Sequence, residues 1–205
     1  MTAPPLIHVV DDDDSLRSAR QRLLAAAGYR VKAYASAGEF LLDPPADAPG
    51  CLLLDLRMPG PSGLDLQEAL VRHGIRLPVI FLSGHGDLAT GVRAMKAGAV
   101  DFLSKPVERE PLLAAVARAL ELDAAQRAAS GVDREMRARF AQLTAREREV
   151  FELVAAGRLN KQIADALGIA ERTVKAQRAQ VMAKLGAANA AELGRIAAQL
   201  RGRAG

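Results

Sequence analysis

The sequence predicts two domains of different fold class: a doubly wound, five-stranded parallel α/β sheet over residues 1–122 and an all-α, four-helix domain over residues 142–205. Two features predict this division. Up to residue 122, five short apolar runs alternate with amphipathic stretches, which is typical of strands covered by helices on both faces. Beyond residue 123, only helical periodicity occurs.

The five apolar runs are the predicted strands, and they occupy residues 6–10, 30–34, 51–56, 79–82 and 99–103. Predicted helices follow them at residues 16–27, from residue 36 onward, and at residues 64–73, 87–97 and 108–122. The apolar stripe of the first helix includes the aliphatic stem of Arg20, and Gly28 ends that helix. Ser36 and Glu39 match a capping box for the second helix.

A linker is predicted at residues 123–141, which are rich in Ala, Arg and Glu and carry no strand pattern. The pair Ser130-Gly131 interrupts this segment, so we expect it to be partly helical. After the linker, Thr144 and Glu147 predict the cap of a helix that ends at Gly157. Three more helices are predicted over residues 161–167, 171–185 and 190–200, with a turn at Gly168.

Charge divides the chain at the same place. Residues 1–123 contain 13 Lys and Arg against 16 Asp and Glu, a net charge of −3, whereas residues 124–205 contain 15 against 8, a net charge of +7. The basic half is therefore a candidate for binding nucleic acid. A basic helical domain of another function fits the charge alone equally well.

Cysteine content and the N-terminal residues indicate the compartment. A single cysteine, Cys51, excludes an intrachain disulfide and fits a reducing cytosol. Residues 1–5 carry no basic side chain, and the apolar run at residues 6–10 ends directly in aspartates. Neither a signal peptide nor a membrane span is predicted, so we expect a soluble cytoplasmic protein.

Polar residues gather at the carboxyl ends of the predicted strands, where open α/β sheets place their functional groups. These residues are Asp11, Asp12, Asp55, Ser83 and Lys105. Carboxylates this close together repel one another unless a cation compensates, and oxygen ligands at an open edge favour Mg²⁺. Asp55 is then a candidate nucleophile that forms an aspartyl-phosphate, with Ser83 and Lys105 contacting its oxygens.

Four motifs carry a family resemblance: Val-Asp-Asp at 10–12, Asp-Leu-Arg-Met-Pro at 55–59, Ser-Gly-His-Gly at 83–86 and Asp-Phe-Leu-Ser-Lys-Pro at 101–106. Over residues 6 to about 122 the chain resembles the flavodoxin-like receiver domain of bacterial two-component response regulators. The resemblance implies that a partner histidine kinase phosphorylates Asp55. The implied Mg²⁺ ligands are Asp12, Asp55, the backbone carbonyl of Arg57 and, through a water molecule, Asp11. The implied switch and phosphate contacts are Ser83, Phe102 and Lys105, with a cis bond between Lys105 and Pro106.

Other residues near these motifs have simpler interpretations. Asp13 and Asp14 fit the N-cap of the first helix better than a ligand role. Phe102 could also be ordinary packing on the sheet. For His85, an influence on phosphate hydrolysis and a plain loop position are equally open, and Asp101 is expected at the surface.

The C-terminal segment has helix-turn-helix geometry, because a short helix, a glycine turn and a longer helix follow one another. Leu-Thr-Ala-Arg-Glu-Arg-Glu-Val at 143–150, Gly-Arg-Leu-Asn-Lys-Gln-Ile-Ala at 157–164 and Glu-Arg-Thr-Val-Lys at 171–175 resemble the LuxR/NarL-type DNA-binding domain, over about residues 140–200. With the receiver-like half, the chain resembles the FixJ-like response regulators. The resemblance implies binding to double-stranded DNA, as a homodimer after phosphorylation.

The facing of the longer helix follows from about 100° of rotation per residue. Val174, Val181 and Leu185 share the core face. Arg178 falls near this face, where a pair with a carboxylate such as Glu147 is favoured over reading a base. The residues expected at DNA are Arg172, Lys175, Ala176 and Ala179 in the groove, with Thr173 and Lys161 on phosphates.

We therefore expect a phosphorylation-dependent transcriptional regulator and not an enzyme. Phosphorylation would move Ser83 and Phe102, reshape the face made by the fourth helix, fifth strand and fifth helix, and promote dimerisation on paired half-sites. A rival phosphohydrolase usually needs a carboxylate two residues after its nucleophile, where this chain has Arg57. A helical domain that only docks protein would lack salt-dependent binding to duplex DNA. Gln177 and Leu159 depart from the family pattern, so base preference stays open.

Overall fold

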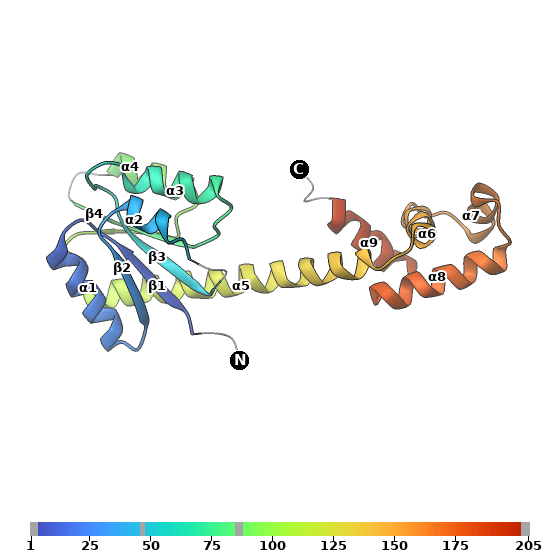
Figure 1. Cartoon of the computed structure of the whole chain (residues 1–205), viewed down its shortest axis with the longest axis horizontal. Helices are drawn as coiled ribbons and strands as arrows, with labels where there is room; N and C mark the ends of the chain where they lie inside the picture. The colour runs from blue at the N-terminus through green and yellow to red at the C-terminus, as the bar shows by residue number, and fades with distance from the viewer. Residues whose placement is uncertain (1–3, 46–47, 85–87, 202–205) are drawn as a thin grey trace. The chain divides into compact units, whose positions relative to one another are not determined.

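The computed structural model describes residues 4–45, 48–84 and 88–201. The chain divides into two compact units, Met1–Arg127 and Ala128–Gly205 (Figure 1). Each unit has its own hydrophobic core, and the two fold classes are those predicted from the apolar periodicity. Among the helices that the structure describes, none is both long and apolar enough to cross a membrane.

The first unit is built on five parallel strands in the order β2-β1-β3-β4-β5. The strands are β1 (Leu6–Val10), β2 (Arg30–Tyr34), β3 (Gly50–Asp55), β4 (Val79–Ser83) and β5 (Asp101–Ser104). The chain turns back on itself between β1 and β3, since β2 lies outside β1 while β4 and β5 lie beyond β3. Such a reversal opens a crevice at the carboxyl ends of the two central strands, where ligands of open α/β sheets bind.

Helices cover both faces of this sheet (Figure 1). They are α1 (Asp14–Ala26), α2 (Ala37–Leu42), α3 (Gly63–Arg72), α4 (Leu88–Lys96) and α5 (Arg109–Ala141). Alternate residues of β3 enter opposite cores: Leu52 and Leu54 pack with α2, α3 and α4, whereas Cys51 and Leu53 pack with α1 and α5. This explains the unbroken hydrophobic runs of the central strands, because both of their faces are buried.

Side-chain caps set the beginnings of the first two helices. Asp13 is the N-cap of α1 and accepts hydrogen bonds from the backbone N–H groups of Ser15 and Leu16 at 2.9 and 3.0 Å, as expected for this aspartate. The capping box predicted at the start of α2 forms only in part. The Ser36 hydroxyl accepts a hydrogen bond from the Glu39 N–H at 3.1 Å, as predicted. The Glu39 carboxylate, however, accepts from the N–H of Ala35 at 2.6 Å and not from the N–H of Ser36.

Helix α5 is longer than the sequence predicts, because it continues without interruption through Ser130 and Gly131 to Ala141. A glycine inside a helix costs only about 1 kcal/mol, which the alanine-rich and charged neighbours offset. A buried polar contact also ties the helix to the sheet. The Asp123 carboxylate accepts from the N–H of Gly50 at 3.0 Å and from Arg127 Nε at 2.9 Å.

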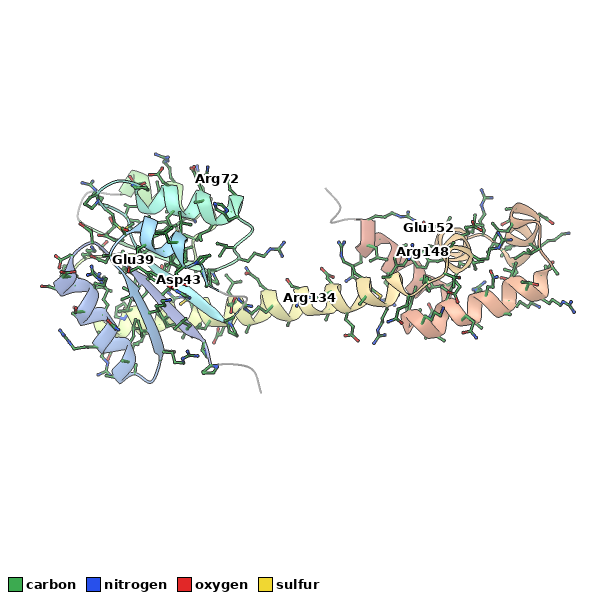
Figure 2. All side chains as sticks on the ribbon, in the orientation of Figure 1. Glu39, Asp43, Arg72, Arg134, Arg148 and Glu152 are labelled. Carbon is green, nitrogen blue, oxygen red and sulfur yellow. The ribbon has the colours of Figure 1, made fainter. Side chains whose placement is uncertain are left out.

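The second unit contains α6 (Ala145–Ala155), α7 (Asn160–Leu167), α8 (Glu171–Leu185) and α9 (Ala190–Arg201), within a few residues of the predicted bounds. Thr144 and Glu147 form the predicted capping box at α6, and Gly168 adopts φ 64° at the α7–α8 turn. Phe140 of α5 packs edge-on against Phe151 of α6, with ring centroids 5.2 Å apart. Arg148, labelled in Figure 2, lies over the Phe140 ring.

Candidate functional site

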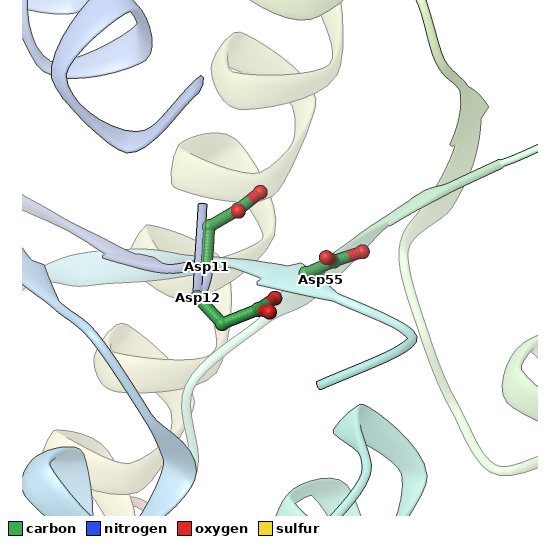
Figure 3. Close-up of side chains that lie close together, drawn as sticks. All are labelled: Asp11, Asp12 and Asp55. Atoms are coloured by element: carbon green, nitrogen blue, oxygen red, sulfur yellow. The ribbon is translucent and has the colours of Figure 1, made fainter. Parts of the chain in front are cut away.

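Three carboxylates meet at the carboxyl edge of the sheet. Asp11 and Asp12 follow β1, and Asp55 ends β3. Each offers an oxygen, and these oxygens lie within 4.8 Å of one another (Figure 3). Asp11 and Asp55 are buried, whereas Asp12 is exposed to solvent. Because β1 and β3 are hydrogen-bonded neighbours, the fold itself brings these acids together.

Lys105 supplies positive charge to the acid cluster from the residue after β5. Its Nζ lies 2.9 Å from Oδ2 of Asp55 and 3.2 Å from Oδ2 of Asp11. Burial raises the pKa of the Asp55 carboxyl above its usual range, while the hydrogen bond and charge of Lys105 oppose that rise. The lysine thus favours the ionised carboxylate, which is the form that acts as a nucleophile.

A second cation, Arg20, lies in the same place and was not predicted there. The sequence analysis expected only its aliphatic stem to pack, but its guanidinium is buried and donates to Oδ2 of Asp11. The available signal was a charged residue on the core-facing stripe of α1, since such a residue needs a buried partner. Arg17, one turn earlier, donates instead to the Asp11 backbone carbonyl at 2.7 Å and pairs with Asp14.

Ser83 and Phe102 occupy the neighbouring strands β4 and β5. Ser83 is fully buried and directly follows Leu82, which is the register partner of Asp55. The Phe102 ring is half-buried and lies against Gly91 of α4, where an added Cβ would come within 3.0 Å of the ring. His85 lies outside the described residues.

Arg57 lies in the loop after β3, two residues beyond Asp55. Its side chain is exposed, and its backbone N–H donates to the Asp55 carboxylate. The bond between Lys105 and Pro106 is cis, as the resemblance implies. Asp101, expected as a plain surface residue, is paired with Arg118 of α5.

The helix-turn-helix presents a solvent face and a core face. Val174, Val181 and Leu185 of α8 are buried, in agreement with the rotation argument. Thr173 is half-buried, and Leu159, at the N-cap of α7, is 69% exposed. Of the residues expected to contact DNA, those with exposed side chains are Lys161, Arg172, Lys175, Ala176 and Ala179.

The predicted pairing of Arg178 with Glu147 was wrong. Arg178 Nη1 donates to Oδ1 of Asn160 at 3.0 Å, which joins α8 to the first residue of α7. Glu147 is bonded instead to Lys184 at 2.7 Å, and this hydrogen bond holds the pKa of the Glu147 carboxyl below its usual range. The reason is position along α8: residue 178 lies beside the start of α7, whereas residue 184 lies beside the start of α6.

Comparison with known proteins identifies both units. Residues 7–117 match the response regulator receiver domain, and residues 141–197 match the bacterial regulatory proteins of the luxR family. The chain is 46% identical over 195 residues to nodulation protein W of Bradyrhizobium diazoefficiens, covering 95% of this chain and 86% of that protein. The chain belongs to the response regulators. Such a receiver joined to a LuxR-type domain makes it a phosphorylation-dependent regulator of transcription.

Other relatives also match this response regulator over almost its whole length. It is 42% identical over 191 residues to the transcriptional regulatory protein FixJ of Rhizobium meliloti, covering 93% of this chain and 94% of that protein. Among solved structures, response regulator StyR is 44% identical with a TM-score of 0.83, covering 95% of this chain and 98% of that one. Full-length FixJ from B. japonicum is 38% identical with a TM-score of 0.60, covering 97% and 98%.

The response regulator carries an apolar hollow on the face made by α4 and β5. It is lined by Gly91, Val92, Met95, Lys96 and Phe102. Val92 and Met95 are 48% and 45% exposed, so two large apolar side chains line this hollow at the surface. Phe102 therefore joins this surface to β5, the strand that directly precedes Lys105.

Proposed function

We propose that Asp55 is the residue through which this response regulator is phosphorylated, with a histidine kinase as donor. The observation that carries the proposal is a buried carboxylate at the sheet reversal with Lys105 Nζ 2.9 Å away. In the transfer, an oxygen of Asp55 forms a bond to phosphorus while the bond between phosphorus and the donor breaks. Lys105 then pairs with the phosphoryl oxygens, and Ser83 donates its hydroxyl to them.

The acid cluster suits Mg²⁺, since it offers several oxygen donors at an edge that solvent can reach. We assign Asp12, Asp55 and the backbone carbonyl of Arg57 as direct ligands. Asp11 acts through a water molecule, because one of its oxygens accepts from the Asp13 N–H at 2.9 Å and the other contacts Arg20 and Lys105. When bound, Mg²⁺ neutralises charge on the phosphoryl oxygens.

Phosphorylation is coupled to the rest of the molecule through Ser83 and Phe102. A hydroxyl drawn toward the phosphoryl group alters the end of β4, and the Phe102 ring changes its packing against α4. The surface around Val92 and Met95 then becomes a homodimer contact, which suits its exposed apolar side chains. Two linked DNA-binding units bind paired half-sites more tightly than one.

On DNA, α8 lies in the major groove with Lys175 and Arg172 at base edges. Ala176 and Ala179 permit close approach and contact thymine methyl groups. Lys161 and Thr173 hold phosphates, which position the protein without reading sequence. In this scheme residues 1–122 form the receiver, residues 123–141 the helical linker and residues 142–205 the DNA-binding domain.

An enzymatic role is disfavoured by the residue two positions after Asp55. A phosphohydrolase that uses an aspartyl-phosphate needs an acid or base there to activate the leaving group or water. Arg57 carries a permanent positive charge and has an exposed side chain, so it provides neither.

The assignment of Asp55 is tested by intact mass measurement after incubation with a small acyl-phosphate and Mg²⁺. The wild-type chain should gain the mass of one phosphoryl group, and Asp55→Asn should gain none while keeping its fold by circular dichroism. Asp14→Asn is the matched control, because Asp14 is exposed, pairs with Arg17 and should leave labelling intact. A phosphate on Asp55→Asn, or equal labelling in excess chelator, would contradict the proposal.

A further inference from the structure

The acid cluster contains a buried cation for which the phosphorylation scheme has no role. Arg20 of α1 is only 7% exposed, and its guanidinium donates to Oδ2 of Asp11, which is itself fully buried. A buried arginine loses its hydration and is retained only where a charged partner compensates. Its position therefore couples α1 directly to the carboxylates that hold the metal.

The contacts of Asp11 show what Arg20 does to the cluster. Oδ2 is shared between Arg20 and Lys105, and Oδ1 accepts from the backbone N–H of Asp13. Both oxygens are thus engaged by donors. Lys105 therefore shares Asp11 with Arg20 and also contacts Asp55, at 3.2 and 2.9 Å respectively.

The charge balance points the same way. The carboxylates of Asp11, Asp12 and Asp55 carry three negative charges, and Lys105 and Arg20 together carry two positive charges. One net negative charge is left to attract a divalent cation. Without Arg20, two net negative charges would remain. The neighbouring Arg17 donates to the backbone carbonyl of Asp11, but its charge is offset by its pair with Asp14, and it is present with or without Arg20, so it does not alter this difference.

We propose that Arg20 is a built-in counter-cation that weakens Mg²⁺ binding at the phosphorylation site. This inference rests on the proposed metal ligands. A positive charge held at a buried carboxylate repels a second cation strongly, because water screens it poorly there. Replacing Arg20 with a neutral side chain should tighten Mg²⁺ binding by about tenfold. Phosphorylation should then saturate at a lower Mg²⁺ concentration than in the wild type.

The test is calorimetric titration of the full-length chain with MgCl₂. Arg20→Met removes the charge and keeps much of the aliphatic stem, and Arg20→Gln also keeps an N–H donor for Asp11, so each variant preserves a different part of the Arg20 contacts. The matched control is Arg22→Met, which removes an exposed arginine from the same helix and should leave the Mg²⁺ dissociation constant almost unchanged. Wild-type or weaker affinity in both Arg20 variants would overturn the inference.

A second readout separates failure of this inference from failure of the metal site. Mg²⁺ bound to the folded state raises the melting temperature, and tighter binding raises it further at the same concentration. Asp12→Asn should lose this rise. If the wild type and the Arg20 variants all fail to bind Mg²⁺, the metal assignment and the inference are both wrong. If Mg²⁺ stabilises the wild type and the Arg20 variants equally, only the inference is wrong.

Discussion

Acidification should destabilise the receiver unit through one buried histidine. His8 of β1 is 2% exposed, and its Nδ1 is hydrogen-bonded to the hydroxyl of Tyr34 at 3.1 Å. Its ring stacks on Tyr34 and meets Phe40 edge-on. Burial, and then the charge of Lys32, lowers the pKa of His8 from 6.5 to about 4, with Asp43 opposing the change.

The sign and size of the effect follow from this difference in pKa. The unfolded chain binds a proton at His8 more readily than the folded chain, so the free energy of unfolding falls as pH drops from about 6.5 toward about 4. Above that window His8 is neutral in both states and contributes no pH dependence. Since one pKa unit is worth about 1.4 kcal/mol, lowering the pH from about 7.5 to about 5 should remove about 2 kcal/mol.

Urea unfolding monitored by tyrosine fluorescence reports on the unfolding of this unit. The sequence has no tryptophan and two tyrosines, Tyr29 and Tyr34, and both lie in the unit Met1–Arg127. In His8→Leu, the free energy of unfolding should not show this decrease of about 2 kcal/mol on acidification. Other titrating groups contribute equally to the wild type and the variant, so their effects cancel in the difference between the two. His73→Leu, at an exposed position after α3, should behave as the wild type does. Identical pH dependence in the wild type and His8→Leu would refute the reasoning.

Two further predictions concern signalling and recognition. Lys105→Ala should still accept phosphate, but the ratio of DNA affinities with and without phosphate should shrink, since a charge-assisted contact worth about 1–3 kcal/mol is lost. A ratio as large as the wild type's would reject this. Lys175→Ala should weaken binding to the specific DNA site by about 1–3 kcal/mol and reduce the discrimination between bases at one base pair. Lys161→Ala should weaken binding to specific and nonspecific DNA alike. It should also lower the slope of log affinity against log salt concentration by about one. Identical salt and sequence profiles for the two variants would show that the facing of α8 is wrong.

The strands and the acid cluster could be predicted because local sequence determines them. Each central strand is buried on both faces, so its run is almost entirely apolar, with His8 of β1 as an exception, and polar residues lie at its end. Asp11 and Asp55 occupy such ends, and a parallel sheet places the ends of neighbouring strands at one edge. Sequence order alone thus locates carboxylates that are more than forty residues apart.

Side-chain partners across packed helices could not be predicted in this way. Periodicity assigned Arg20 and Arg178 to core-facing positions, but it could not give the direction in which a long side chain extends. Arg20 reaches back to the end of β1, and Arg178 reaches an amide on α7 in place of the expected carboxylate. Both outcomes depend on the distance between elements, which the sequence of a single helix does not contain.

The length of α5 shows the same limit at the level of a whole helix. Ser130-Gly131 is a reasonable local signal for a break, but it competes with contacts on either side of it. Upstream, Asp123 and Arg127 hold the helix against the start of β3, and downstream Phe140 packs in the core of the second unit. Helix formation is cooperative, so two anchored segments joined by residues of good helix propensity outweigh one glycine at about 1 kcal/mol. Those anchors are tertiary contacts, which the sequence of the segment itself does not contain.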